Sequence, residues 1–415
     1  MQRCFARRAG ARARFIYTAH VHELLDASAV TLARWIRQRK LSPVELLEAL
    51  IARIADVNPA INAVIAERHD AARAEALVAE HRLMHEPVES LPPLLGLPYT
   101  AKEYIRATGM PLSAGIWSRR HIRSDRDAET VARLARAGAI LVGITNVPEG
   151  GLWMETYNDV YGRTRNPWDL RRTAGGSSGG EGAIVASGGV AFGLGADVGG
   201  SIRIPAAFCG CVGHKPTGRM VPNTGFWPEP TGELSAYLVC GPLTRRVEDI
   251  HPILSVLAGP DGVDPVVKDW SLPDPASIDL RGITVYPLGG NGRIWVRPPM
   301  RLAVQRASEA LQARGAVLGD LEGSRMRRAF PIWSAMMSLS GSPPYADILG
   351  GDQPIAVVRE LARLIVGRSR HTLPALLVVA LEKLSNNFSG QKHQLVAVGK
   401  LLQHCLLYTS DAADE

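Results

Sequence analysis

Two serines in glycine-rich stretches are the first residues of this sequence whose surroundings could support chemistry. Ser177 lies in "GGSSGGEG" at 175–182, and Ser201 lies in "DVGGSIR" at 197–203. Glycines let backbone N–H groups approach a ligand closely, and a row of N–H groups just before a serine can form an oxyanion hole beside a nucleophile. We therefore expect Ser201 to attack, with its own N–H group and those of the three preceding residues as oxyanion donors. These three are Val198, Gly199 and Gly200.

The base that would activate such a serine is not a histidine. No histidine and aspartate are spaced around the serines as in a serine-hydrolase triad, and His214 lies in a "GHKPTG" loop that suggests a structural role. Lys102, at the end of the strand-like "GLPYTAKE", is the alternative, because burial lowers the pKa of a lysine. Taken alone, however, this lysine would more often be a solvated strand end, and Ser177 more often a turn residue or helix cap.

The segments that must position these residues alternate between helices and strands. "LSPVELLEALIARIADVNP" predicts a helix with a capping box from Ser42 to Glu45 and an end at Pro59. A sheet covered by helices on both faces, the α/β class, is the architecture that such alternation indicates. Further helices are expected at 68–82, from a cap at Asp127 to Gly138, at 300–314 and at 373–384, and strands at 96–103, 139–146 and 281–288.

Composition and charge exclude several other classes. The 415 residues carry a net charge of +7, and arginines in the first 14 residues account for much of it, which indicates a poorly ordered basic extension over 1–26. No long apolar run predicts a signal or spanning helix, and no basic cluster interleaved with aromatics predicts a nucleic-acid partner. The five irregularly spaced cysteines favour reduced thiols in a cytoplasmic protein. Neither a metal-ligand cluster nor a nucleotide fingerprint is present, so no cofactor and no metal are expected.

The segment from Gly175 to Pro205 resembles the signature segment of the amidase signature family. The resemblance implies a single α/β domain with a central mixed sheet and a catalytic Ser-cisSer-Lys unit. It identifies Lys102 as the base, Ser177 as the bridging serine that follows a cis peptide, and Ser201 as the acylated serine. The implied reaction is cleavage of an amide through an acyl-enzyme, with Ser178 counted in the oxyanion and substrate-binding set.

Residues that flank this unit are given supporting roles. We expect Asp197 and Arg203 to form a buried ion pair that fixes the nucleophile loop. Tyr157, Asn158 and Arg165 are expected to brace the loop that faces the glycines. Apolar residues that could line an acyl tunnel, although they are more often plain core, are Trp153, Met154, Met336, Met337, Leu376 and Leu377.

Longer motifs favour one branch of the family. "TNVPEGGLWMETYNDVYGRTRNPWD" at 145–169 and "CGPLTRRVED" at 240–249 resemble the fatty-acid amide hydrolases and their bacterial relatives. Fatty-acid or aryl amides are therefore the expected small-molecule substrates, with esters a related class. The alternatives are a glutamine-amidase subunit of a tRNA-dependent amidotransferase and a catalytically silent binding protein. The apolar stretch at 373–384 also allows the hypothesis of peripheral contact with a membrane, and a homodimer is a further alternative.

The C-terminal part is expected to depart from the family. Amidase-signature chains normally run further, so the sequence predicts a domain over 27–405 that lacks the C-terminal part of the fold. The polar close of "LLYTSDAADE" does not continue the preceding helical pattern, which suggests a non-native tail over 406–415. An inactive fragment is therefore a further alternative.

Overall fold

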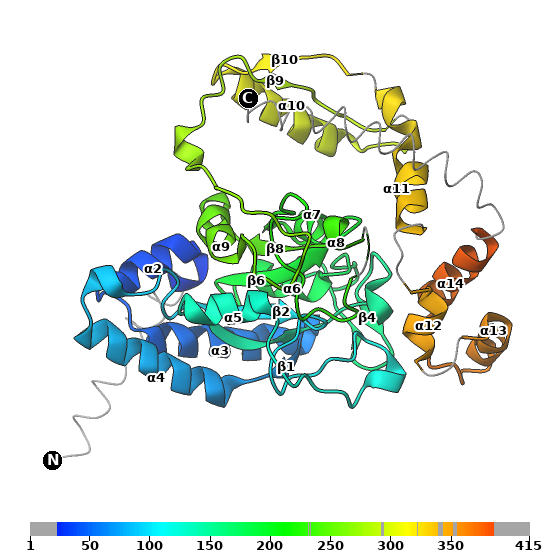
Figure 1. Ribbon diagram of the computed structural model, residues 1–415, viewed down its shortest axis with the longest axis horizontal. Helices are drawn as coiled ribbons and strands as arrows, with labels where there is room; N and C mark the ends of the chain where they lie inside the picture. Colours follow the sequence, from blue (N-terminus) through cyan, green and yellow to red (C-terminus); the bar gives the residue numbers. More distant parts are fainter. Residues whose placement is uncertain are drawn as a thin grey trace. The chain divides into compact units, whose positions relative to one another are not determined.

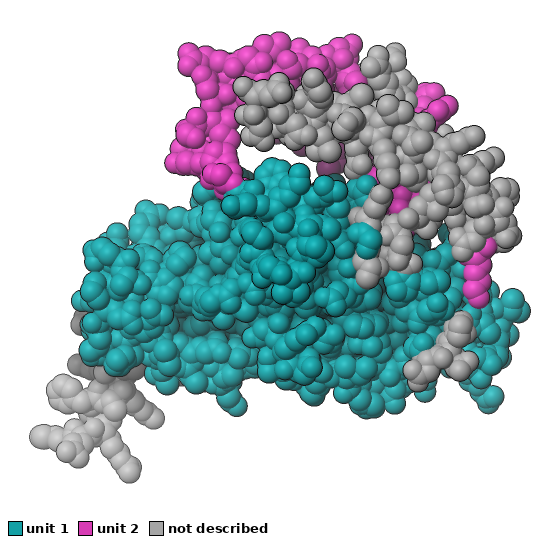
Figure 2. Space-filling view, viewed as in Figure 1, with its two compact units in different colours: residues 1–270, 343–382 teal, residues 271–342, 383–415 magenta. Residues whose placement is uncertain are grey.

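The computed structural model divides the chain into two compact units. Unit 1 comprises residues 1–270 and 343–382, and unit 2 comprises residues 271–342 and 383–415 (Figure 2). The expected tail over 406–415 and most of the expected extension over 1–26 lie outside the described residues. The structure describes residues 23–230, 232, 234–291, 294–321, 323–338, 343–351 and 355–385.

A six-stranded mixed sheet forms the centre of the described part of unit 1. β2 (Pro98–Lys102) pairs in parallel with β3 (Ile140–Thr145) on one side and with β6 (Phe192–Asp197) on the other. The remaining pairings are antiparallel, which confirms the mixed sheet that the sequence resemblance implied. The strand order is β1-β3-β2-β6-β8-β7, with β1 at Val64–Glu67, β7 at Val212–Gly213 and β8 at Val239–Thr244.

Helices cover this sheet, as the alternation of patterns predicted (Figure 1). Helix α3 (Pro43–Ile61) packs against α4 (His69–His85) and α6 (Gly179–Ala186), while α5 (Glu129–Arg136) packs against α9 (Ile250–Leu257). The glycine-rich segment that carries both serines supplies α6 and β6. Two short strands of unit 1, β4 (Tyr157–Asn158) and β5 (Gly162–Arg163), pair with each other. The other α-helices in the described part of unit 1 are α2 (Ala29–Arg37), α7 (Arg203–Cys209), α8 (Leu234–Tyr237), α12 (Tyr345–Gly350), α13 (Val357–Ile365) and most of α14 (Leu373–Ser385).

Two helix boundaries differ from the prediction. The Ser42 capping box is present, but α3 continues past Pro59 to Ile61. The helix ends there because Asn62 adopts a left-handed conformation, and its N–H group bonds to Asn58 O. Asp127 does not cap α5, which begins at Glu129. Its carboxylate instead accepts hydrogen bonds from the N–H group and the hydroxyl of Thr108, so it joins two loops.

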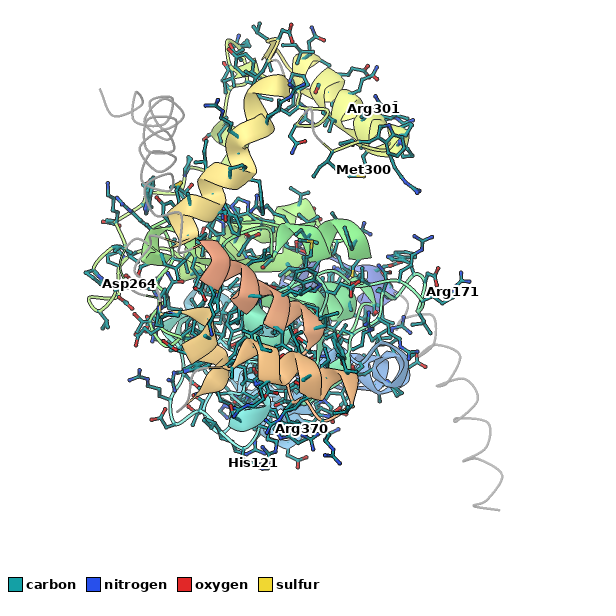
Figure 3. The ribbon with its side chains drawn as sticks, turned by 90° about the vertical axis from the view of Figure 1, so that its right-hand side faces the viewer. His121, Arg171, Asp264, Met300, Arg301 and Arg370 are labelled. Atoms are coloured by element: carbon teal, nitrogen blue, oxygen red, sulfur yellow. The ribbon has the colours of Figure 1, made fainter. Side chains whose placement is uncertain are left out.

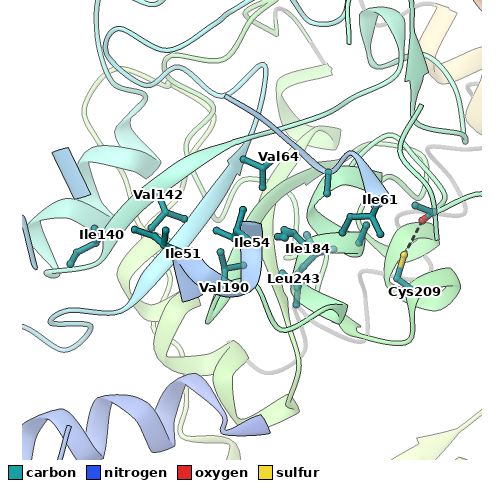
Figure 4. Packing of buried hydrophobic residues seen from close by; sticks show 14 of the residues in the cluster. Ile51, Ile54, Ile61, Val64, Ile140, Val142, Ile184, Val190, Cys209 and Leu243 are labelled. Carbon is teal, nitrogen blue, oxygen red and sulfur yellow. Dashed lines mark hydrogen bonds between the residues drawn. The ribbon is translucent and has the colours of Figure 1, made fainter. Parts of the chain in front are cut away.

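The core of unit 1 lies between α3, α6 and the strands (Figure 4). Ile51 and Ile54 from α3 belong to one cluster with Val142 from β3 and Ile184 from α6. Cys209 is part of the same cluster and is a free thiol, as expected for the cysteines of this chain. Removal of this apolar surface from water is the dominant force that holds the helices against the sheet.

Unit 2 contains fewer buried residues in its described part. Its helices are α10 (Pro298–Gln312), which carries Met300 and Arg301 (Figure 3), and α11 (Ala329–Ser338). The strand expected at 281–288 is shorter than predicted, because only β9 (Thr284–Val285) pairs, in parallel with β10 (Val317–Leu318). In the described part of the chain, no helix is both long and apolar enough to cross a membrane.

Candidate active site

The end of β2 places Lys102 in direct contact with Ser177. The lysine side chain is fully buried, and its Nζ donates hydrogen bonds to Ser177 Oγ at 2.6 Å and to Ala196 O at 3.3 Å. The same Nζ lies 4.4 Å from the centre of the Tyr104 ring. Two residues that are 75 positions apart in the sequence therefore meet as the resemblance implied, and the lysine is more deeply buried than a strand-end lysine would be.

Burial decides the charge of this lysine. Removal from water lowers the pKa of Lys102 to about 7, although the charge of Asp197, and that of Glu181 wherever it is ionised, act in the opposite direction. A large fraction of the amine is then uncharged near neutral pH. An uncharged amine that touches a serine hydroxyl can accept its proton, which is what a general base must do.

The loop before α6 presents Ser177 to the lysine. The peptide between Gly176 and Ser177 is cis, as in the family that the sequence resembles. Glycine is required at Gly176, because a Cβ atom there would lie 2.7 Å from Trp153 O. Thr156 holds both ends of this loop, since its hydroxyl donates to Gly175 O at 2.9 Å and accepts from the N–H group of Gly179 at 3.0 Å. Thr156 was not predicted as a functional residue, because a lone threonine in a loop carries no pattern.

Ser201 lies in the turn after β6, beside the first serine loop. The N–H group of Ser178 donates to Ser201 O at 3.0 Å, which joins the two glycine-rich loops. Ser201 is partly exposed, and among the described residues no hydrogen bond connects its hydroxyl to Ser177 or Lys102. The structure therefore brings Lys102 and Ser177 into contact and places Ser201 on the adjoining turn.

The expected oxyanion donors are only in part available. Gly200, at a φ of +113°, directs its N–H group to Asp197 Oδ1 at 2.7 Å, so this donor already has a partner. The Ser178 hydroxyl is buried and donates to Ala196 O at 3.3 Å, which makes it a support of the backbone. Gly199 is exposed and Val198 is partly exposed, so this part of the turn faces solvent.

Asp197 organises the turn that carries Ser201. Its carboxylate accepts from the N–H groups of Gly200 and Ile202 and from two nitrogens of Arg203 at 2.9 and 3.0 Å. Burial would raise the pKa of Asp197, but these hydrogen bonds outweigh it and lower the pKa to about 2. The ion pair is confirmed, but it is not buried as a whole, because Arg203 keeps 54% of its side chain exposed while Asp197 is fully covered.

Two of the three residues expected to brace the glycine loop, Tyr157 and Asn158, act elsewhere. Asn158 donates to Asn146 Oδ1 at 2.8 Å and to Val147 O at 2.6 Å, so it holds the segment that follows β3. The Tyr157 hydroxyl donates to Asp159 at 3.0 Å. Arg165 donates its backbone N–H group to Ile61 O and pairs in an antiparallel bridge with Thr173, whose hydroxyl accepts from the N–H group of Gly175 at 3.0 Å. The neighbouring Thr156 makes further contacts to the glycine loop.

A cavity of about 440 Å³ in unit 1 is lined by residues from the segments 148–163 and 364–375, and none of the residues that line it belongs to either serine loop. Trp153 lines it as expected, but much of the remaining lining is polar and includes Glu149 and His371. Glu149 accepts from His371 Nδ1 and from the N–H group of Thr372, both at 2.7 Å, so it fixes the segment before α14. The side chain of Arg370, labelled in Figure 3, lies over the ring of Trp117.

The other residues proposed for an acyl tunnel do not line this cavity. Leu376 is fully buried and therefore belongs to the core. Met154 and Leu377 are exposed and lie outside the lining. Met336 and Met337 belong to unit 2. No group of three or more potential metal ligands is found among the described residues.

Comparison with known proteins relates this geometry to a family. The family model described as "Amidase" matches residues 45–396. Fatty-acid amide hydrolase 2-A from Danio rerio is 38% identical over 375 residues, which cover 86% of this chain and 69% of that protein. A glutamyl-tRNA(Gln) amidotransferase subunit from Roseiflexus castenholzii is 35% identical over 302 residues, 71% of this chain and 59% of that protein. The crystal structure of a bacterial aryl acylamidase matches with a TM-score of 0.71 and 27% identity, over 89% of this chain and 75% of that chain.

Proposed function

This chain belongs to the amidase family of amide hydrolases, and from that premise we propose that it cleaves carboxylic amides through an acyl-enzyme formed on Ser201. Lys102 is the base in this proposal, and Ser177 is the relay between base and nucleophile. The observation that carries it is the contact of 2.6 Å between a fully buried lysine amine and the Ser177 hydroxyl. A lysine kept out of water in this way has no evident structural function that an apolar residue could not serve better.

The proposed reaction begins with two proton transfers. The uncharged Lys102 amine takes the proton of Ser177 as Ser177 takes the proton of Ser201, and Ser201 Oγ forms a bond to the amide carbon. The oxyanion faces the exposed part of the turn, where the N–H groups of Gly199 and Ser201 are the proposed donors. Lys102 then returns its proton through Ser177 to the leaving nitrogen as the C–N bond breaks, and a water molecule hydrolyses the ester on Ser201.

Fatty-acid or aryl amides are the substrates that we propose. This choice rests on the similarity to a fatty-acid amide hydrolase and to an aryl acylamidase, whose names state their substrate classes. The similarity to a component of a tRNA-dependent amidotransferase supports a second candidate, the release of ammonia from glutamine. Hydrolysis of oleamide, of an aryl acylamide and of glutamine, measured in parallel, separates the candidates.

Covalent labelling tests the proposed nucleophile directly. A fluorophosphonate should add one phosphonyl group to Ser201, and peptide mass spectrometry locates the group. Ser201→Ala should lose both labelling and hydrolysis. Ser187→Ala is the matched control, because this serine only caps the far end of α6 through a bond to Ala183 O. Labelling at another residue, or hydrolysis that survives in Ser201→Ala, would contradict the proposal.

A further inference from the structure

A buried carboxyl group shares one face of the sheet with the catalytic lysine. Side chains two residues apart on a strand point to the same face, which places Thr100 beside Lys102 on β2. Thr145 is the partner of Lys102 across the parallel pairing with β3. Glu181 is fully buried against this group, with its carboxylate within hydrogen-bond distance of Thr100 Oγ1 at 2.6 Å and of Thr145 Oγ1 at 2.8 Å.

Helix α6 and strand β2 make two successive contacts here. Ser177 just before α6 meets Lys102, and Glu181, one helical turn later, meets Thr100. Gly193, the partner of Thr100 on β6, leaves the room that the carboxyl fills, because a Cβ atom there would lie 2.1 Å from Glu181 Oε2. The carboxyl group is therefore fixed in place on three sides.

The two hydroxyl partners of this carboxyl can serve its ionised form and its neutral form. Its hydrogen-bond partners among the described residues are the two hydroxyls, and no ion pair to it is found there. The Thr145 hydroxyl also lies 3.5 Å from Ala101 O, so it can donate to that carbonyl while it accepts the proton of Glu181. A buried carboxylate served only by hydroxyls is costly. Burial therefore raises the pKa of Glu181 to about 8, although the two hydrogen bonds and the charge of Lys102 act in the opposite direction.

We propose that Glu181 is a positioning residue that is a neutral carboxylic acid near pH 7, so that the hydrogen-bonded groups beside Lys102 carry no negative charge there. This inference rests on the proposed function of Lys102 as a base. An ionised Glu181 would favour the charged ammonium form of the lysine, which cannot accept a proton.

Other titratable groups also lie around the pair. The Tyr104 ring lies against the Lys102 amine and Cys240 acts on its pKa, and because burial raises the pKa of both Tyr104 and Cys240, they are neutral near pH 7. Cys211 faces Glu181 and is likewise held neutral, because burial raises its pKa. Asp197 is the other carboxylate near the pair; it is ion-paired with Arg203, and its charge still raises the pKa of Lys102. An ionised Glu181 would add to this effect.

Infrared difference spectroscopy reads the protonation of Glu181 without turnover. At pH 7 the wild-type protein should show the C=O stretch of a protonated carboxyl that disappears in Glu181→Gln. Glu103→Gln is the matched comparison. Glu103 is another fully buried glutamate, and burial raises its pKa to about 7, so its carboxyl band must be distinguished from that of Glu181. Thr145→Val should shift the Glu181 band, because the hydroxyl that accepts its proton is gone. A protonated-carboxyl band that is unchanged in both Glu181→Gln and Thr145→Val would overturn the inference.

Kinetics supply the second readout. Glu181→Gln is neutral and nearly isosteric, so its pH midpoint for hydrolysis should match that of the wild type, whereas Glu181→Leu should lose activity because both hydroxyls lose their partner. A midpoint in Glu181→Gln that is lower by about one unit or more would show that the carboxylate was ionised. The two proposals fail separately, because the infrared band tests Glu181 even in a protein without amidase activity. Amide hydrolysis by a wild-type protein that lacks the infrared band of protonated Glu181 would overturn the inference on Glu181 and leave the proposed function intact.

Discussion

Substitution of Lys102 by methionine should separate stability from activity. Methionine is close to lysine in length and is apolar, so it can fill the same buried site with little repacking. It cannot accept a proton. We therefore expect Lys102→Met to reduce amide hydrolysis by roughly 10²–10⁴-fold, the range that general-base catalysis contributes, and at the same time to raise the free energy of unfolding.

The magnitude of the stability gain follows from the pKa of the lysine. In the unfolded chain Lys102 has its ordinary pKa of 10.5, and burial lowers this to about 7 in the folded protein. At pH 7 that difference corresponds to a destabilisation of about 4 kcal/mol by the wild-type lysine. Loss of the hydrogen bond to Ser177 offsets about 1–2 kcal/mol of it, so the net gain of Lys102→Met is roughly 2–3 kcal/mol.

The stability difference between Lys102→Met and the wild type should depend on pH. A lysine whose folded pKa is lowered destabilises the folded protein at low pH, and this penalty disappears as the pH rises from 7 to 10.5. The advantage of Lys102→Met should therefore be full below pH 7 and should shrink between pH 7 and about 10.5. Urea unfolding of both proteins over this range measures it, with Lys40→Met as the control at an exposed lysine. A variant that is less stable than wild type at pH 7, or a difference that does not change with pH, would refute the reasoning.

Three further predictions concern the loops that hold the serines. Thr156→Val keeps the shape of the side chain but leaves the N–H group of Gly179 without its partner, which should cost about 1–3 kcal/mol in urea unfolding; no loss would contradict the bracing role. Asp197→Asn breaks the pair with Arg203 and should reduce fluorophosphonate labelling of Ser201 while far-ultraviolet circular dichroism stays unchanged; normal labelling would show that the turn does not need this carboxylate. Gly180→Ala should lower the melting temperature measured by calorimetry, because its Cβ atom would lie 2.6 Å from Asn146 N, and an unchanged melting temperature would show that the backbone yields there.

The sequence predicted the residues that belong to periodic or strongly patterned segments. The capping box at Ser42, the apolar face of α3 and the buried strand before Asn146 all appear as expected, because local spacing determines them. The pairing of Lys102 with Ser177 came from the resemblance to a family. Its physical cause is the contact of α6 with β2, two elements that are far apart in the chain.

The rest depends on contacts that no spacing in the sequence reveals. Thr156 and Glu181 act through partners 19 to 81 residues away. Gly200 was expected to donate to an oxyanion, but its N–H group is taken by Asp197, a local turn contact that a pattern of glycines does not show. Exposure of Arg203 was likewise unpredictable, because it depends on what the folded chain leaves uncovered.

The central claim is that an uncharged Lys102 amine activates Ser201 through Ser177. The rate at which a fluorophosphonate reacts with Ser201, measured against pH on the wild-type chain, tests it most directly, because this step needs the base and no substrate recognition. The rate should rise with pH along a single titration whose midpoint is near 7, the pKa to which burial lowers Lys102, and it should be slow at all pH values in Lys102→Met. A midpoint near 10.5, or an unchanged rate in Lys102→Met, would contradict the account.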